Sequence, residues 1–189
     1  MANFTVVYDA NVLYSAVLRD FFVELALTEA VEARWTEEIH SEWMRNVLKN
    51  RPDITRDRLT RTKNLMDFYV TNSLVTGYEE IIPELELPDA GDRHVLAAAI
   101  RCDASLIITF NLRDFPSEVL APYDLKAQHP DDFVLDLLTI DRKTVCQAAE
   151  KQRRRLKNPP KTIDEYLATL EQQGLIQSAA LMRQLCYQN

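Results

Sequence analysis

The chain has 189 residues, of which 47% are hydrophobic and 27% are charged, so it can bury a core and is not a disordered chain. Its formal net charge of −7 is unevenly distributed, because residues 1–140 carry a net charge of −11 and residues 141–189 carry +4. This distribution excludes a broad nucleic-acid coat. It predicts a carboxylate-rich body that needs cations, followed by a basic tail.

Membrane and export signals are absent from the sequence pattern. No apolar run approaches the roughly 20 residues that cross a bilayer, and the first residues lack a basic segment and a cleavage site. We therefore expect a cytoplasmic protein with no membrane partner.

The cysteines and histidines are scattered. Cys102, Cys146 and Cys186 form no CxxC pair, which predicts buried free thiols rather than a disulfide framework or a zinc site. His40, His94 and His129 show no paired spacing, and this disfavours a nitrogen-ligated metal.

The first half of the chain begins with a short apolar run. Residues 4–8 are β-branched or aromatic and end at Asp9, which predicts a buried strand. Apolar residues at helical spacing follow over residues 10–18 and 21–31. Thr36 is expected to cap a helix and Thr55 to begin another, and the inner face of the second is expected to carry Leu59, Leu65, Met66 and Tyr69.

Further elements continue an alternating pattern. Residues 73–76 form a candidate second strand, residues 79–92 a loop, and residues 94–101 an Ala-rich helix. Residues 106–110 form the clearest strand, followed by a short helix near 117–120 and a strand near 125–127. Strands separated by helices predict an α/β fold, with a parallel β-sheet flanked by helices.

The remainder is helical only. We expect helices over residues 132–140 and 144–156, a third capped by Thr162 with Glu165 at the capping-box position, and a last one over 175–185 after Gly174. This predicts two parts, residues 1–140 as the α/β domain and residues 141–189 as an all-helical C-terminal extension.

Several carboxylates lie at the positions where a fold of this kind binds its ligands. Parallel sheets bind ligands at the carboxyl ends of their strands, which are marked here by Asp9 and by the loop from Asn111 to Asp114. Asp92 opens the Ala-rich helix, and Glu42 can reach in from an adjoining helix. Oxygen ligands of this kind select hard cations, so Mg²⁺ or Mn²⁺ is expected.

Each of these residues also has a structural interpretation. Asp9 and Asp92 could cap the helices that follow them. Glu42 could be a solvated helix residue, and Asp114 could close a turn with Asn111. Asp89 could be an ordinary loop residue.

Four segments, taken in order, carry a family resemblance. The segments Val7 to Leu13, Ser41-Glu42-Trp43, Asp92 to Ala99 and Thr109 to Phe115 resemble the PIN-domain proteins, and in particular their VapC-type toxin ribonucleases. The similarity covers roughly residues 4–135. The helical tail resembles the C-terminal extension of some members.

The resemblance implies a PIN-like fold and a Mg²⁺- or Mn²⁺-dependent endoribonuclease that cleaves single-stranded or structured RNA with metal-activated water. It also implies a cognate antitoxin and a homodimer. It assigns metal-ligand and catalytic roles to Asp9, Glu42 and Asp92. Many members have Asp at the position of Asn111, and here Asp114 supplies that carboxylate.

Supporting residues surround this set. The resemblance gives Asn11 and Thr109 a role in hydrogen bonding at the site, and Asn111 and Asp89 adjoin it. Arg45, Arg93 and Arg113 are candidates for RNA phosphate contacts. The basic run over residues 151–157 could also contact RNA, although a solvated helix end whose cations suit the helix dipole is favoured.

Two other functions stay open. The first is a catalytically weak PIN module that binds RNA or a protein partner, which Asn111 in place of Asp favours. The second is a nuclease that acts on DNA.

Overall fold

The computed structural model describes residues 4–28 and 30–187. In this part the strands are β1 (Thr5–Tyr8), β2 (Glu32–Arg34), β3 (Leu106–Ile108) and β4 (Lys126–Gln128). The α-helices are α1 (Ala10–Tyr14), α2 (Ala16–Leu27), α3 (Glu37–Asn50), α4 (Arg56–Tyr69), α5 (Arg93–Arg101), α6 (Ser117–Leu120), α7 (Pro130–Arg155), α8 (Ile163–Gln172) and α9 (Ile176–Tyr187). Short 3₁₀ turns are η1 (Ile82–Glu84), η2 (Ala90–Asp92), η3 (Leu112–Asp114) and η4 (Ala121–Tyr123).

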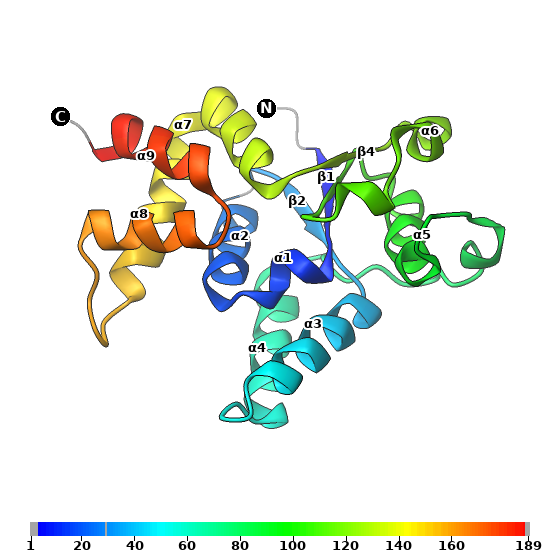
Figure 1. The fold of residues 1–189 in the computed structure, drawn as a ribbon, viewed down its shortest axis with the longest axis horizontal. Helices are drawn as coiled ribbons and strands as arrows, with labels where there is room; N and C mark the ends of the chain where they lie inside the picture. The colour runs from blue at the N-terminus through cyan, green and yellow to red at the C-terminus, as the bar shows by residue number, and fades with distance from the viewer. Residues whose placement is uncertain (1–3, 29, 188–189) are drawn as a thin grey trace.

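The four strands form one sheet in the order β2-β1-β3-β4, and every pairing is parallel. Val7 of β1 pairs with Arg34 on one side and with Ile107 on the other. Val7 and Ile107 are fully buried, as expected for central strands that helices cover. The predicted α/β fold, with helices around a parallel sheet and a helical C-terminal region, is confirmed (Figure 1).

The prediction of a strand over residues 73–76 was wrong. Leu74 forms only an isolated bridge to Trp35, held by hydrogen bonds from Trp35 N to Ser73 O (2.9 Å) and from Val75 N to Trp35 O (2.8 Å). The edge of the sheet is taken by β2 instead. Its Ala33 is buried, while Glu32 and Arg34 form an ion pair of 2.7 Å, so pairing with β1 outweighs the weak strand propensity of these residues.

Local capping chemistry sets several helix starts. The Thr36 hydroxyl accepts from Ile39 N, and the Thr55 hydroxyl accepts from Arg58 N. Thr162 and Glu165 form the predicted capping box at the start of α8. These three predictions are confirmed.

Other helix details differ from the sequence prediction. Ser15 ends α1 and caps α2, which stops at Leu27 rather than at residue 31. On α4, Leu65 and Tyr69 are exposed at 46% and 60%, so only Leu59 and Met66 of the predicted inner face are buried. By contrast, the two helices expected on either side of residue 141 are present as the two segments of α7, which a kink at Asp141 (φ −144°, ψ 71°) separates.

The C-terminal helices pack against α2. Gln152 of α7 donates a hydrogen bond to Val17 O (2.8 Å) at the start of α2, and Tyr166 of α8 donates to Gln152 (2.7 Å). In Figure 1 these helices lie beside α2, on the opposite side of the molecule from α5.

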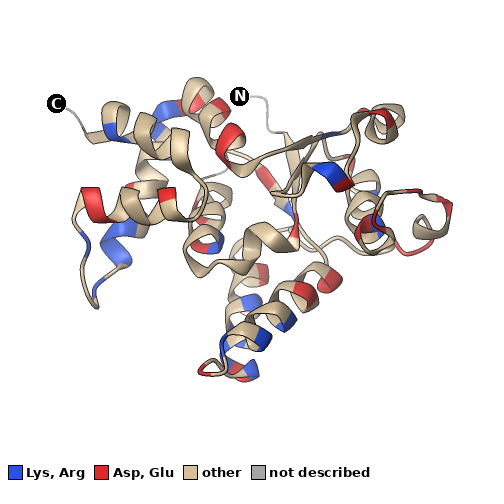
Figure 2. Ribbon diagram, in the orientation of Figure 1, with Lys and Arg blue, Asp and Glu red and all other residues tan. Residues whose placement is uncertain are grey.

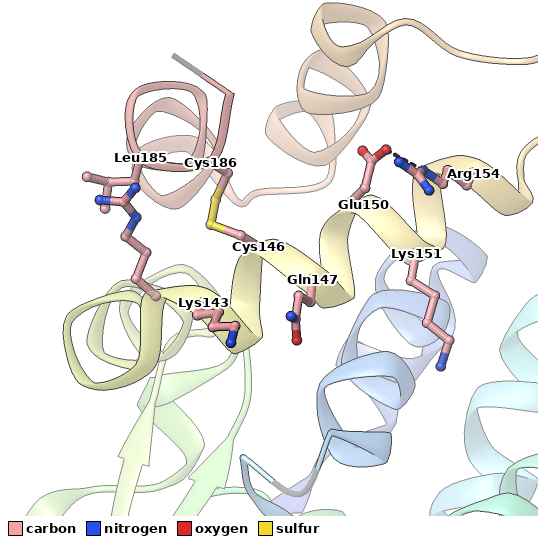
Figure 3. Close-up of a pocket in the computed structure, with 9 residues that line it drawn as sticks. Lys143, Cys146, Gln147, Glu150, Lys151, Arg154, Leu185 and Cys186 are labelled. Atoms are coloured by element: carbon pink, nitrogen blue, oxygen red, sulfur yellow. Dashed lines mark hydrogen bonds and ion pairs between the residues drawn. A yellow bond between two sulfur atoms is a disulfide. The ribbon is translucent and has the colours of Figure 1, made fainter. Parts of the chain in front are cut away.

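The interpretation of the cysteines as free thiols was wrong for two of them. Cys146 of α7 and Cys186 of α9 form a disulfide with a Cα–Cα distance of 5.3 Å (Figure 3). The two residues are 40 positions apart, and the packing of α9 on α7 brings them together. Cys102 is free and half-buried.

Four of the five cations in the basic run form ion pairs within the described residues. Lys151 (2.9 Å) and Arg155 both pair with Glu24 of α2, whose side chain is 1% exposed. Arg153 and Arg154 pair with Glu150 (2.8 and 2.6 Å), and Figure 3 shows Arg154 turned toward it. Lys151, Arg154 and Arg155 stay 53–75% exposed at the end of α7, as the solvated helix end favoured from the sequence requires, and two of them also tie α7 to α2.

Within residues 4–28 and 30–187, none of the helices is both long and apolar enough to cross a membrane.

Candidate active site

The acidic residues singled out in the sequence lie around the carboxyl ends of β1 and β3. Asp9 directly follows β1, and η3 with Asp114 follows β3. Asp92 stands immediately before α5, and Glu42 lies on α3. Figure 2 shows acidic segments at the end of β1, along the first turns of α3 and around the loop that leads into α5.

Asp9 is buried and is held by three donors. Its side chain accepts hydrogen bonds from Ala10 N (2.5 Å), Asn11 Nδ2 (2.6 Å) and Thr109 Oγ1 (2.7 Å). Burial raises the pKa of Asp9, the Thr109 hydrogen bond opposes this, and the charge of Glu42 raises the pKa further. Asp9 thus caps α1, as its structural interpretation suggested, and also faces another carboxylate.

Asn11 and Thr109 form a small network beside Asp9. Asn11 Nδ2 also donates to Thr109 Oγ1 (2.9 Å), and Asn11 Oδ1 accepts from Phe110 N (3.1 Å). Thr109 Oγ1 accepts from Asn111 N (3.0 Å). One fixed unit therefore links the ends of β1 and β3 and orients the Asp9 carboxylate.

Asp92 sits among other carboxylates. Burial and the charges of Asp9, Asp114 and Asp89 together raise its pKa to about 7. One carboxylate oxygen from each of Asp89, Asp92 and Asp114 lies within 4.8 Å of the others. Asp92 makes no side-chain cap on α5, so capping does not account for its position.

Two members of this cluster, Asp89 and Asp114, also take part in local turns. Asp89 accepts a hydrogen bond from Gly91 N (2.7 Å), and the Asn111 side-chain amide donates to Asp114. The proposed turn between Asn111 and Asp114 is therefore present. It also leaves the Asp114 carboxylate beside Asp92, which a turn does not require.

Glu42 reaches the site from a firmly anchored helix. The next residue, Trp43, is fully buried and donates to His40 Nδ1 (2.9 Å), and the Arg19 guanidinium lies 4.5 Å from the Trp43 ring centroid. The Glu42 carboxylate is 3.5 Å from His94 Nε2, and its charge acts on Asp9. Glu42 is thus more than a solvated helix residue.

Sequence reasoning missed His94 and Glu38. His94 is 5% exposed, and its Nδ1 lies 3.9 Å from Glu38 Oε2. The spacing from Asp92 to His94 and from Glu38 to Glu42 was visible. Their meeting depends on how α3 sits against the start of α5, which no local pattern encodes.

The three arginines are not part of the carboxylate network. Arg45 and Arg113 are exposed, and Arg93 is half-buried with its Nε buried and unpaired within the described residues. Over that same part of the chain, none of the three forms an ion pair. Their assignment to RNA phosphates stays a prediction.

The donor set fits a divalent cation. Every candidate ligand is a carboxylate oxygen, which hard ions such as Mg²⁺ and Mn²⁺ prefer. Burial raises the pKa of Asp92 and of Asp9, and the charges of neighbouring carboxylates raise both further, so these groups repel one another as anions. A bound cation would relieve this repulsion.

Comparison with known proteins agrees with this geometry. Residues 5–113, which contain the sheet strands β1 to β3 and all of these carboxylates except Asp114, match the PIN-domain family. The chain belongs to the PIN-domain family. Residues 130–184 match a family described as the VapC50 C-terminal domain. The resemblance found in the sequence is thus confirmed for both parts of this PIN-domain protein.

One curated relative supports the assignment. A protein of Mycobacterium tuberculosis (strain ATCC 25618 / H37Rv) named "Putative ribonuclease VapC50" is 46% identical over 71 residues. The matched stretch covers 38% of this PIN-domain chain and 41% of the relative. The search of solved structures gave no match.

Proposed function

We propose that this PIN-domain protein is a metal-dependent endoribonuclease that acts as the toxin of a toxin–antitoxin pair. The observation that carries the proposal is the cluster of Asp89, Asp92 and Asp114, in which one oxygen of each lies within 4.8 Å of the others. The charge of Asp9 also acts on Asp92, whose pKa is raised to about 7. The family match and the ribonuclease name of the relative support it.

The proposed ligands of a Mg²⁺ or Mn²⁺ ion are Asp9, Glu42, Asp92 and Asp114. When bound, such an ion supplies an activated water and compensates the charge that develops on a phosphodiester. Thr109 and Asn11 keep the Asp9 carboxylate in place through their hydrogen bonds. Asp89 is proposed to support the site, since it offers a carboxylate oxygen to the same cluster as Asp92 and Asp114.

RNA is the proposed substrate and a cognate antitoxin the proposed protein partner. Arg45, Arg93 and Arg113 are proposed to contact RNA phosphates, since they lie on the segments that carry Glu42, Asp92 and Asp114. A homodimer and a location in the cytoplasm complete the proposal. We also propose that residues 1–140 form the nuclease domain and residues 141–189 the extension.

Cleavage assays test the proposal. Wild-type protein with Mn²⁺ should cleave single-stranded RNA oligonucleotides and leave matched DNA intact, and Asp9→Asn should abolish the cleavage. Asp53→Asn is the control, because Asp53 is exposed and pairs only locally with Arg51 (2.6 Å). Cleavage of DNA at a similar rate, or full activity of Asp9→Asn, would contradict the proposal.

A second candidate function rests on Asn111. Its amide hydrogen bond to Asp114 occupies a carboxylate that would otherwise be free to bind metal, which favours a catalytically weak module that binds RNA or a protein. Asn111→Asp removes that donor. If the second candidate is right, wild type binds RNA without cutting it, and Asn111→Asp gains cleavage.

A further inference from the structure

His94 lies where the start of α5 meets α3, beside the carboxylate cluster. The imidazole is 5% exposed and belongs to the residue two positions after Asp92. Its Nε2 is 3.5 Å from Glu42 Oε2, and its Nδ1 is 3.9 Å from Glu38 Oε2. Glu38 and Glu42 are one turn apart on α3, so one ring faces two carboxylates.

The polar atoms of this ring are not explained by packing. Nδ1 is buried and has no hydrogen-bond partner within the described part of the chain, which is costly for an imidazole nitrogen. An apolar residue would fill the same space without that cost.

Glu42 needs a partner that fixes its orientation. It projects from α3, whereas the other carboxylates follow strands or open α5, and a glutamate loses substantial rotamer freedom when it is held in one geometry. Within the described residues, His94 is the side chain with which Glu42 forms an ion pair.

We propose that His94 is a positioning residue that holds the Glu42 carboxylate toward the cluster through Nε2, with the Glu38 carboxylate 3.9 Å from Nδ1 on the other side of the ring. This role rests on the proposed function, because it presumes a divalent cation among the carboxylates. Hydrogen-bonding partners of metal ligands typically change metal affinity 10- to 100-fold when they are removed.

Two variants separate the ring nitrogens. In His94→Gln the amide nitrogen stands near the position of Nε2, and in His94→Asn it stands near Nδ1. Binding of Mn²⁺, followed by the electron paramagnetic resonance signal of the free ion, should weaken about 10- to 100-fold in His94→Asn. His94→Gln should stay close to wild type. Thermal melts establish that both variants are folded.

A double-mutant cycle tests whether His94 acts through Glu42. In a Glu42→Gln background, His94→Asn should cause no further loss of Mn²⁺ affinity, because the group it positions is already removed. Additive losses would overturn the proposal. Equal losses in His94→Gln and His94→Asn would also overturn it, since that result describes packing.

A measurement on His94 itself covers the case in which a variant fails to fold. With ¹⁵N-labelled histidine, Glu42→Gln should shift the ring resonances of His94 and leave those of His129, which caps α7, in place. Unchanged His94 resonances would contradict the proposed contact.

The outcomes also separate this role from the proposed function. If wild type binds Mn²⁺, His94→Asn weakens that binding and no RNA is cut, the nuclease proposal fails and the role of His94 stands. If wild type cuts RNA and His94→Asn binds Mn²⁺ normally, the role of His94 fails alone. A wild type that binds no Mn²⁺ overturns both.

Discussion

Thr109 shows how a single hydroxyl can organise a site built from distant segments. It donates to Asp9 (2.7 Å), and accepts from Asn11 Nδ2 (2.9 Å) and Asn111 N (3.0 Å). The hydroxyl therefore fixes the carboxylate that ends β1 to the loop that follows β3. It also stabilises the ionised form of a buried acid.

Thr109→Val tests this role. Valine has nearly the same shape but cannot donate to Asp9, so we expect Mn²⁺ affinity and RNA cleavage to fall about 10- to 100-fold with the fold retained. Thr109→Ser, which keeps the hydroxyl, should stay near wild type. Equal activity of the valine and serine variants would show that the hydrogen bonds are not needed.

The Asp92 carboxyl makes stability depend on pH. Its pKa is about 7 in the folded chain and near 3.8 ordinarily, so the folded state binds this proton more tightly than the unfolded state. The resulting stabilisation is present below about pH 4 and is lost as the pH rises through about 7.

Asp92→Asn should remove this pH-dependent loss of stability, because asparagine has no carboxyl group that ionises. We expect urea unfolding without divalent cations to show that the free energy of unfolding of wild type falls, relative to that of the variant, as the pH rises from 5 to 8. Asp53→Asn should show no such trend, because the Arg51 hydrogen bond lowers the pKa of Asp53 and keeps it ionised throughout. If the difference in free energy of unfolding between Asp92→Asn and wild type does not change with pH, the raised pKa of Asp92 is refuted.

At the scale of elements, local chemistry could be predicted and long-range pairing could not. Thr36, Thr55 and Thr162 begin helices because a hydroxyl caps its own helix. β2 has the sequence Glu-Ala-Arg, which shows no strand pattern, and it exists because β1 pairs with it. Residues 73–76 have that pattern but lie outside the main ladder.

The same distinction applies to the candidate site. Asp9 and Asp114 follow strands, so the rule on strand ends placed them. The clustering of Asp89 with Asp92 and Asp114 depends on the loop before α5. His94 and Glu38 meet through the packing of two helices, and the Cys146–Cys186 bond likewise depends on tertiary packing.

The disulfide between α7 and α9 should stabilise the extension. It closes a loop of 40 residues, for which chain entropy predicts about 4 kcal/mol. Cys146→Ser should lower the free energy of unfolding under oxidising conditions by up to that amount, as measured with urea. Cys102→Ser serves as the control, because Cys102 is free. If a reductant destabilises wild type and Cys146→Ser equally, the bond does not form in solution.

At the scale of the whole molecule, ion pairs join the basic extension to the acidic first part of the chain. Glu24 of α2 is buried and pairs with Lys151 and Arg155 of α7. The turn between α8 and α9 also approaches the site, since a Cβ on Gly174 would lie 2.9 Å from Phe110 Cε1. Phe110 N in turn donates to Asn11 (3.1 Å). The extension therefore lies against Phe110, which is hydrogen-bonded to one of the residues that orient Asp9.

Gly174→Ala tests this coupling. Gly174 has a φ of +96°, so alanine should destabilise the fold by about 1 kcal/mol or more, and displacement of Phe110 should also lower RNA cleavage. Gly77→Ala is a matched control, because Gly77 has a φ of +72° but faces only the Arg101 side chain at 3.6 Å. Both variants should lose stability, measured by urea unfolding. Equal cleavage by the two would contradict the coupling.

The most direct test of the carboxylate centre is anomalous diffraction from crystals grown with Mn²⁺. We expect a manganese peak bonded at about 2.1 Å to carboxylate oxygens of Asp9 and Asp92, with Glu42 and Asp114 beside it. If crystals grown at a saturating Mn²⁺ concentration show no anomalous peak at these carboxylates, or show manganese only elsewhere, the proposed metal centre is contradicted.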